Sequence, residues 1–346
     1  MSKLTQQLRH NWFKLRVRLM LPVRRSELSD ALTIELTNRC TLACSCCPNG
    51  REPQGCRPKH NMTAATFQQL LRQIDIPFHQ VYLHLHGEPF LNKDLPDIVE
   101  QLRRRGVRQY SLFSNGYHID LSVLEQLLAK TEDCELDLCF SAELYSKQSY
   151  EKIRYPGQYE TACQSLDAID EVMARHGKSY SLIAIIDEEA IGELSHTVPP
   201  LFSRYRQLRD IRFSSAFPWP HLPETGAIAG HLGHRRRICS HLWHLPVILA
   251  SGEVSMCSND YRGECIVGSL HDHKYSRLLN NRAARRFRRN IACREADRNS
   301  ICRECLIDRL DTFSRIVRRH FVETAKEESL NKYFASYHKY FDVEKD

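Results

Sequence analysis

The sequence predicts an α/β fold built on a parallel sheet, followed by a small domain held together by cysteine ligands. Two patterns indicate the sheet: six short β-rich runs recur from residue 32 to residue 214, and amphipathic helical segments lie between them. The third observation is that cysteine, histidine and arginine become dense beyond about residue 220, where strand and helix patterns stop alternating. This change in composition and in the strand–helix pattern indicates a second, smaller domain.

The composition is that of a chain that buries a core in a reducing compartment. Of the 346 residues, 42% are hydrophobic and 26% are charged, which suffices for one large domain and a smaller one. The formal net charge of +7 is compatible with an acidic ligand but does not by itself indicate nucleic-acid binding. Fourteen cysteines without a secretion signal favour metal or redox ligands over disulfides, so we expect a cytoplasmic protein.

Residues 1–30 are predicted to form a basic amphipathic helix. Lys14, Arg16 and Arg18 interrupt its apolar stretch, so the segment does not span a membrane. We expect it to pack on the main domain, and peripheral contact with a membrane surface or a partner is the alternative.

The alternating pattern divides the chain into four parts. The predicted strands are 32–37, 80–86, 110–114, 137–141, 181–186 and 211–214. The clearest predicted helices are 63–74, 95–105 and 121–129. The predicted parts are the N-terminal helix (1–30), the sheet-bearing domain (31–220), the cysteine-ligated domain (221–310) and a helical tail (311–346). Sheets of this kind place their chemistry at the carboxyl ends of the strands.

The first cysteine group follows the first strand directly. Cys40, Cys44 and Cys47 have the spacing C-x3-C-x2-C, with Cys46 as an additional thiol. Thiolates are the usual ligands of iron–sulfur clusters, whereas a structural zinc site needs four protein ligands in paired knuckles. Three thiolates on a four-iron cluster leave one iron without a protein ligand, and an open metal position is where chemistry can occur.

Further motifs follow in order and identify a family resemblance. They are His86-Gly87-Glu88-Pro89, Ser114-Asn115-Gly116, Ser141-Ala142-Glu143 and Tyr150-Glu151-Lys152-Ile153-Arg154. With the cysteine spacing, they resemble the radical S-adenosylmethionine superfamily over residues 32 to about 215. The sequence departs from the family pattern at three positions: Cys46 replaces an aromatic residue, His86 a glycine and Glu143 a shorter acid. The resemblance implies a partial (β/α)6 barrel.

The resemblance also implies a cofactor and a reaction. The unique iron of the 4Fe-4S cluster would bind the amino and carboxylate groups of S-adenosylmethionine, and one electron would cleave this cofactor to a 5′-deoxyadenosyl radical that abstracts hydrogen from a substrate. The implied cofactor-binding residues are Gly87, Glu88, Ser114, Asn115, Ser141, Glu143 and Arg154. Glu88 suits a cationic amino group, and Asn115, Ser141 and Glu143 suit a ribose. Arg154 either holds a carboxylate or simply packs.

The second cysteine group lies in the C-terminal part. Cys239 and Cys257 flank Gly252 in the form C-x12-G-x4-C, and Cys302-Arg-Glu-Cys305 follows. Four thiolates suffice for one closed cluster or for a structural zinc site. The arrangement resembles the twitch domain, a shortened SPASM domain, which implies an auxiliary 4Fe-4S cluster on these four cysteines. Cys265 and Cys293 fit this spacing less well as ligands, and from its position alone Asp260 is a candidate general base.

The twitch and SPASM resemblance implies two substrate classes, a sugar or cyclitol and a ribosomally made peptide, with oxidation, epimerisation or cross-linking as the outcome. About thirty residues precede the first predicted strand, whereas an independent domain seldom has fewer than about 40. We therefore expect no leader-binding domain there. This favours a small-molecule substrate, or a peptide that a separate partner delivers. We expect a flavodoxin- or ferredoxin-type electron donor.

Two other functions stay open. The arginine run at 282–298 motivates an RNA-modifying radical enzyme, although no recognisable RNA-binding module supports nucleic-acid binding. The other alternative is a non-catalytic iron–sulfur protein of electron transfer, which would not need the cofactor motifs.

Overall fold

The structure is a computed structural model of the whole chain. It describes residues 31–185, 194–214, 219–222, 239 and 241–305, together with Trp12 and Leu15. The predicted helix at 1–30 is thus described at two residues, both helical and exposed, and the predicted tail at 311–346 lies outside the described residues. Among the helices of the described part, none combines the length and the apolar character that crossing a membrane requires.

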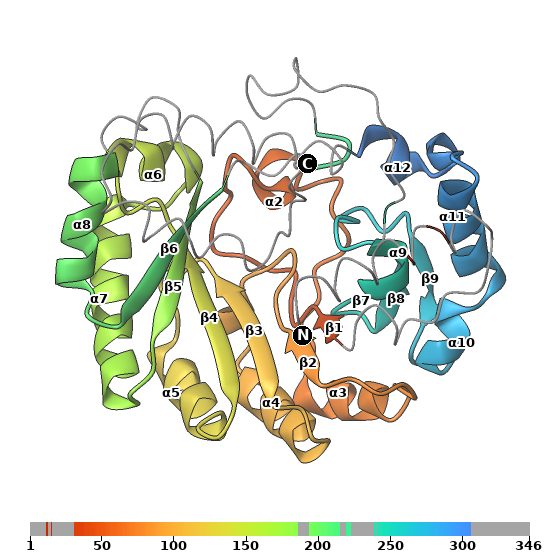
Figure 1. Cartoon of the computed structure of the whole chain (residues 1–346), viewed down its shortest axis with the longest axis horizontal. Helices are drawn as coiled ribbons and strands as arrows, with labels where there is room; N and C mark the ends of the chain where they lie inside the picture. Colours follow the sequence, from red (N-terminus) through yellow and green to blue (C-terminus); the bar gives the residue numbers. More distant parts are fainter. Residues whose placement is uncertain are drawn as a thin grey trace.

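Six parallel strands lie side by side in chain order and form the curved sheet of Figure 1. They are β1 (Ala31–Ile34), β2 (Gln80–Tyr82), β3 (Gln109–Ser114), β4 (Glu135–Ser141), β5 (Tyr180–Ile185) and β6 (Leu208–Ser214). This order confirms the predicted partial (β/α)6 barrel. The second strand is shorter than predicted, although Leu83 still donates a backbone hydrogen bond to Ser111 beyond its end (2.9 Å).

Helices follow the strands and, apart from α6 at its upper edge, cover the outer face of the sheet (Figure 1). They are α3 (Ala64–Leu71), α4 (Leu95–Arg104), α5 (Leu121–Lys130), α6 (Lys147–Ile153), α7 (Tyr159–Arg175) and α8 (Leu194–Arg204). Local sequence sets where several begin: the side chains of Thr63, Asp120 and Ser146 accept hydrogen bonds from the first turns of α3, α5 and α6.

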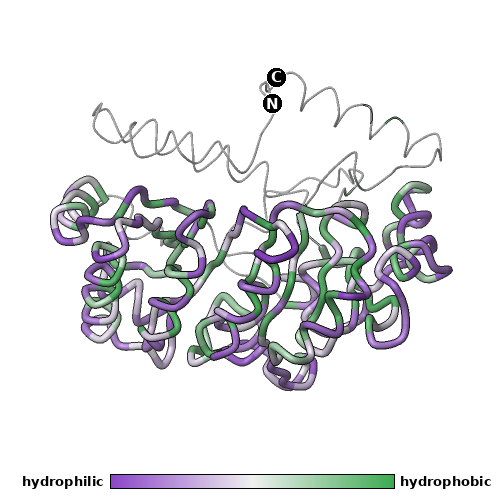
Figure 2. Tube along the Cα trace, turned by 90° about the horizontal axis from the view of Figure 1, so that it is seen from below, coloured by the Kyte–Doolittle hydropathy of each residue, from purple (hydrophilic) through white to green (hydrophobic). Residues whose placement is uncertain are grey.

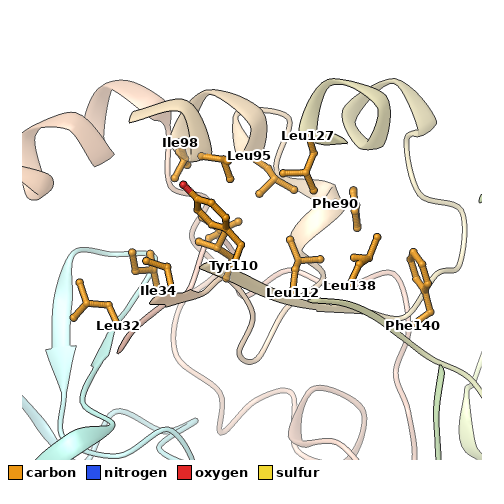
Figure 3. Packing of buried hydrophobic residues seen from close by; sticks show 14 of the residues in the cluster. Leu32, Ile34, Phe90, Leu95, Ile98, Tyr110, Leu112, Leu127, Leu138 and Phe140 are labelled. Atoms are coloured by element: carbon orange, nitrogen blue, oxygen red, sulfur yellow. The ribbon is translucent and has the colours of Figure 1, made fainter. Parts of the chain in front are cut away.

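The core lies between these helices and the strands. Figure 3 shows Leu95 and Ile98 of α4 facing Tyr110 and Leu112 of β3, and all four are buried. Along the chain trace in Figure 2, hydrophilic stretches alternate with hydrophobic ones on the helices, as an outer layer packed on a sheet requires. The core therefore holds the strands in place and leaves their carboxyl ends free for chemistry.

The C-terminal part continues the same sheet. Its elements are α9 (His241–His244), β7 (Val247–Ile248), β8 (Glu253–Ser255), β9 (Ile266–Ser269), α10 (Tyr275–Leu279), α11 (Arg282–Ala292), η5 (Ala296–Arg298) and α12 (Ser300–Glu304). Strand β7 pairs in parallel with β1, and β8 and β9 follow antiparallel. The described strands thus form one nine-stranded sheet, and the domain boundary near residue 220 stays a prediction.

The turn between β7 and β8 depends on Gly252. Its φ of +83° lies in the left-handed region, and its N–H donates to the carbonyl of Leu249 (2.8 Å). A Cβ at this position would lie 2.6 Å from Nε2 of His271. The glycine of the predicted C-x12-G-x4-C pattern is therefore the residue that lets the chain return toward Cys257.

Candidate functional site

Cys40, Cys44 and Cys47 lie on the loop of residues 38–47, here termed the cysteine loop, between β1 and the short helix α2 (Pro48–Arg51). Burial raises the pKa of Cys40 to about 11. Burial also raises the pKa of Cys47, and negative charge on Cys44, Cys46 and Cys40 would raise it further. These mutual effects mean that the thiols lie beside one another, and a buried group of thiolates needs a positively charged centre.

Backbone hydrogen bonds fix the cysteine loop independently of any metal. Ala43 donates to the carbonyl of Tyr155 (2.6 Å), and Ser45 donates to the carbonyl of Ile153 (2.9 Å). Both acceptors belong to the segment that ends α6. A Cβ on Gly50 would lie 2.3 Å from the carbonyl oxygen of Ala43, so α2 can fold back on the loop only with glycine there.

Glu88 is a buried carboxylate beside this loop. It is the N-cap residue of the short 3-10 helix η2 (Pro89–Leu91). Its oxygens accept hydrogen bonds from Ser114 Oγ (2.9 Å), the Asn115 N–H (2.7 Å) and the Phe90 N–H (3.1 Å). Burial raises its pKa to about 7, and no cationic side chain of the described residues forms an ion pair with it. A cationic ligand group would supply the missing charge.

Gly87 and Asn115 bring the ends of β2 and β3 against the cysteine loop. A Cβ at Gly87 would lie 2.2 Å from the carbonyl oxygen of Thr37, so only glycine permits this approach. The side-chain amide of Asn115 lies 3.5 Å from Cys40 Sγ and 3.4 Å from Thr41 Oγ1. Three of the sequence motifs therefore converge on one place.

The Ser141, Glu143 and Arg154 side chains bind one another. Arg154 makes a two-point ion pair with Glu143, from Nε to Oε2 and from Nη2 to Oε1, each at 2.7 Å. Its Nη2 also donates to Ser141 Oγ (2.7 Å), and its Nη1 lies 3.8 Å from Cys44 Sγ. Arg154 thus holds a carboxylate of the chain itself by a bidentate pair, and its role in cofactor binding stays a prediction. Ribose binding by Glu143 stays a prediction that would require this pair to rearrange.

The sequence analysis missed a buried charged group beside Gly87. Arg57 donates from Nη1 and Nη2 to Glu35 (3.0 and 2.7 Å), and its Nη2 lies 3.0 Å from His86 Nδ1. Glu35 also accepts from the Ala250 N–H (3.1 Å) in the C-terminal part. The sequence hinted at this group only through His86, which stands in place of a glycine. Its partners Glu35 and Arg57 lie far from His86 in the sequence, so no local pattern links the three residues.

The second cysteine group assembles on the C-terminal part. Burial raises the pKa of Cys257, and negative charge on Cys239, Cys305 and Cys302 would raise it further, so the four predicted ligands lie together. Cys265 is fully buried. Negative charge on Cys257 and Cys302 would also raise the pKa of Cys265, which indicates that it lies beside this group.

Asp260 accepts hydrogen bonds from four donors. Its Oδ1 accepts from the N–H groups of Gly263 (2.9 Å) and Glu264 (2.7 Å). Its Oδ2 accepts from Ser255 Oγ (2.8 Å) and the Cys265 N–H (2.7 Å). The buried carboxylate therefore shapes the loop between β8 and β9, and its role as a general base stays a prediction.

The segment after α2 contacts the loop that follows Cys257. Glu52, at the end of α2, accepts from Tyr261 Oη (2.6 Å) and from Arg262 Nη2 (2.6 Å), which follow Cys257. Arg57 donates its backbone N–H to the carbonyl of Tyr261 (3.1 Å). Hydrogen bonds therefore tie the chain just beyond the cysteine loop to the chain just beyond Cys257.

The donor chemistry of both groups fits iron–sulfur clusters. All seven predicted ligands are thiols that form no disulfide. Thiolates are the usual ligands of iron–sulfur clusters, and four of them also suit a structural zinc site.

Family models match both parts of the chain. The radical SAM superfamily model matches residues 34–198, and the SPASM model, an iron–sulfur cluster-binding domain, matches residues 239–306. These ranges contain all seven predicted cysteine ligands.

Curated relatives match in part. A probable GTP 3′,8-cyclase of Sulfolobus acidocaldarius is 34% identical over 112 residues, which are 32% of this chain and 33% of that protein. A probable GTP 3′,8-cyclase of Methanococcus maripaludis is 25% identical over 143 residues, 40% of this chain and 45% of that protein. The chain thus spans less than half the length of these two relatives.

Solved structures show the same fold. The crystal structure of BtrN in complex with AdoMet and 2-DOIA aligns with a TM-score of 0.52 and 16% identity, over 80% of this chain and 93% of that one. Native anSMEcpe with bound AdoMet and Cp18Cys peptide aligns with a TM-score of 0.55 and 12% identity, over 81% and 87%.

Proposed function

Since the chain is an enzyme of the radical SAM superfamily with a SPASM-type iron–sulfur domain, we propose that it cleaves S-adenosylmethionine on a 4Fe-4S cluster held by Cys40, Cys44 and Cys47. When bound, such a cluster would supply one electron that splits S-adenosylmethionine into methionine and a 5′-deoxyadenosyl radical able to take hydrogen from a substrate. The auxiliary 4Fe-4S cluster would be held by Cys239, Cys257, Cys302 and Cys305.

The observation that carries this proposal is the buried, unpaired carboxylate of Glu88 beside the cysteine loop. A carboxylate away from water is costly unless a cation neutralises it. Glu88 therefore suits the amino group of S-adenosylmethionine, and the hydrogen bonds from Ser114 and Asn115 hold both of its oxygens in place. The amide of Asn115, 3.5 Å from Cys40 Sγ, would bond to that ligand sulfur or to the ribose.

Arg154 and Glu143 have a supporting part in the same site. The guanidinium of Arg154, buried and 3.8 Å from Cys44 Sγ, brings positive charge to a place where thiolates gather. Glu143 balances that charge and fixes the orientation of the guanidinium through two bonds. We propose that this pair stabilises the thiolate of Cys44 and closes one side of the cofactor site.

For the substrate, we propose a sugar- or cyclitol-like molecule or a peptide, which the enzyme oxidises, epimerises or cross-links. Two similar folds support this range, one described with 2-DOIA and one with a peptide. The curated relatives named as GTP cyclases add GTP to the compounds to be tested. The electron would come from a flavodoxin- or ferredoxin-type protein.

The test is to measure iron, sulfide and zinc after anaerobic reconstitution, in the wild type and in a Cys40/Cys44/Cys47→Ala variant. Two four-iron clusters predict about 8 irons, falling to about 4 in the variant, with loss of 5′-deoxyadenosine formation under dithionite. About 4 irons plus zinc in the wild type would refute the auxiliary cluster. Full iron without cofactor cleavage would instead favour the non-catalytic electron-transfer protein.

A further inference from the structure

Helix α11 exposes a row of four arginines that neither cluster site uses. Arg282, Arg285, Arg286 and Arg289 are exposed and recur at the three- and four-residue spacing of one helix face, here termed the arginine face. In the part of the chain that the structure describes, no carboxylate forms an ion pair with any of the four, whereas nearby Arg298 pairs with Glu295 (3.1 Å). The arginine face therefore presents uncompensated positive charge to solvent.

The buried side of the same helix leads to the second cysteine group. The side-chain amide of Asn299 donates to the carbonyl of Phe287 in α11 (3.4 Å), and the same nitrogen lies 3.7 Å from Cys302 Sγ. Asn290 of α11 donates to the other end of that amide (2.7 Å). One buried side chain thus separates the backbone of α11 from a proposed cluster ligand, and Figure 1 shows α11 beside α12 at the edge of the molecule.

We propose that the arginine face docks an acidic one-electron donor protein of the flavodoxin or ferredoxin type, which reduces the auxiliary cluster. The inference rests on the proposed function, because it needs a cluster on Cys302 and its three partners. In the transfer, the donor loses one electron and the cluster gains it, and no bond forms or breaks. Charge complementarity would steer the donor to α11, whose backbone is separated from Cys302 by the side chain of Asn299.

The observations favour this partner over a nucleic acid. Proteins that bind single strands combine basic residues with exposed aromatic side chains on which bases stack. Phe287, the aromatic residue of α11, is buried, and the guanidinium of Arg286 lies over its ring (5.8 Å). Since α11 exposes arginines but no aromatic ring, it suits an acidic protein surface better than stacked bases.

The experiment compares two charge-matched variants of the reconstituted protein. The first is Arg282→Gln/Arg286→Gln/Arg289→Gln on the arginine face. The control is Arg72→Gln/Lys93→Gln/Arg104→Gln, three exposed cations on and beside α3 and α4. For each protein we would measure 5′-deoxyadenosine formation against the concentration of reduced flavodoxin, at low and high salt, and in parallel with dithionite.

We expect the first variant to raise the KM for flavodoxin by about tenfold or more at low salt, with a weaker salt dependence, because long-range charge attraction is lost. Its rate with dithionite and its iron content should equal those of the wild type and of the control, which shows that both clusters are intact. Equal KM values for flavodoxin in all three proteins would overturn the proposal.

Direct binding separates this proposal from the proposed function. Fluorescence anisotropy of labelled flavodoxin reports docking even if the protein cleaves no S-adenosylmethionine. Weaker flavodoxin binding in the first variant alone supports the docking surface. Loss of binding to a short single-stranded RNA in that variant, with unchanged flavodoxin binding, would overturn it in favour of nucleic acid. Absence of dithionite-driven cleavage in the wild type would refute the proposed function and leave the docking result standing.

Discussion

The substitution Glu35→Gln should destabilise the protein by breaking the buried group that joins the barrel, the segment after α2 and the C-terminal part. The side chain of Glu35 is 0% exposed and that of Arg57 is 7% exposed. Glutamine keeps the shape of the side chain but removes its charge, so Arg57 stays buried without an ionic partner. Removing one member of a buried ion pair typically costs about 3–5 kcal/mol.

The pKa of Glu35 gives an independent magnitude. Burial raises this pKa, but hydrogen bonds from His86 and Arg57 and the charge of Arg57 outweigh burial and lower it from 4.5 to about 2. At about 1.4 kcal/mol for each pKa unit, the difference corresponds to about 3 kcal/mol. Because folding lowers the pKa, this stabilisation is present above pH 4.5 and is lost as the pH falls toward 2.

The assay is urea unfolding of the reconstituted protein at pH 7, followed by circular dichroism. Glu35→Gln should lower the free energy of unfolding by about 3 kcal/mol. The control Glu100→Gln removes the exposed pair with Arg104 on α4 (2.9 Å) and should cost less than about 0.5 kcal/mol. The double variant Glu35→Leu/Arg57→Met should lose less than Glu35→Gln, because no charge stays buried. Equal effects of Glu35→Gln and Glu100→Gln would refute the reasoning.

Four further predictions address the two cysteine groups. Gly87→Ala should remove about half of the iron, because the new Cβ would lie 2.2 Å from the carbonyl oxygen of Thr37. Iron analysis that finds the wild-type iron content would show instead that the loop moves aside. Cys46→Ala should keep both the iron content and the dithionite-driven cleavage of the wild type, and lost iron would make Cys46 a ligand. Asp260→Asn should lower the free energy of unfolding by about 1–3 kcal/mol, since an amide nitrogen then faces N–H donors; unchanged unfolding with abolished turnover would support the general-base hypothesis. Glu88→Gln should raise the Kd for S-adenosylmethionine by about tenfold, measured by calorimetry, with the iron content intact, and an unchanged Kd would remove Glu88 from the cofactor site.

The contrast between Glu88 and Asp260 shows why position in the sequence indicates the surroundings of one carboxylate and not those of the other. Glu88 sits within a contiguous motif at a strand end, and parallel strands bring such ends to one edge of the sheet. Asp260 was assigned from its nearness to Cys257 alone. Its four donors, among them Ser255 Oγ and the N–H of Cys265, come together only when the loop between β8 and β9 closes.

By itself, the sequence determined the parallel α/β class and the first cysteine group, because these depend on local periodicity and a short spacing. The barrel and the second cysteine group followed from the resemblance to a known family. Only the tertiary structure decided that β7 pairs with β1 and extends the barrel sheet. It also decided that Arg154 forms an ion pair with Glu143, and that Glu35, Arg57 and His86 form one buried group. Such contacts join residues that are distant in the chain. A charged side chain needs a partner only once folding has removed it from water, so the pairing depends on the folded structure.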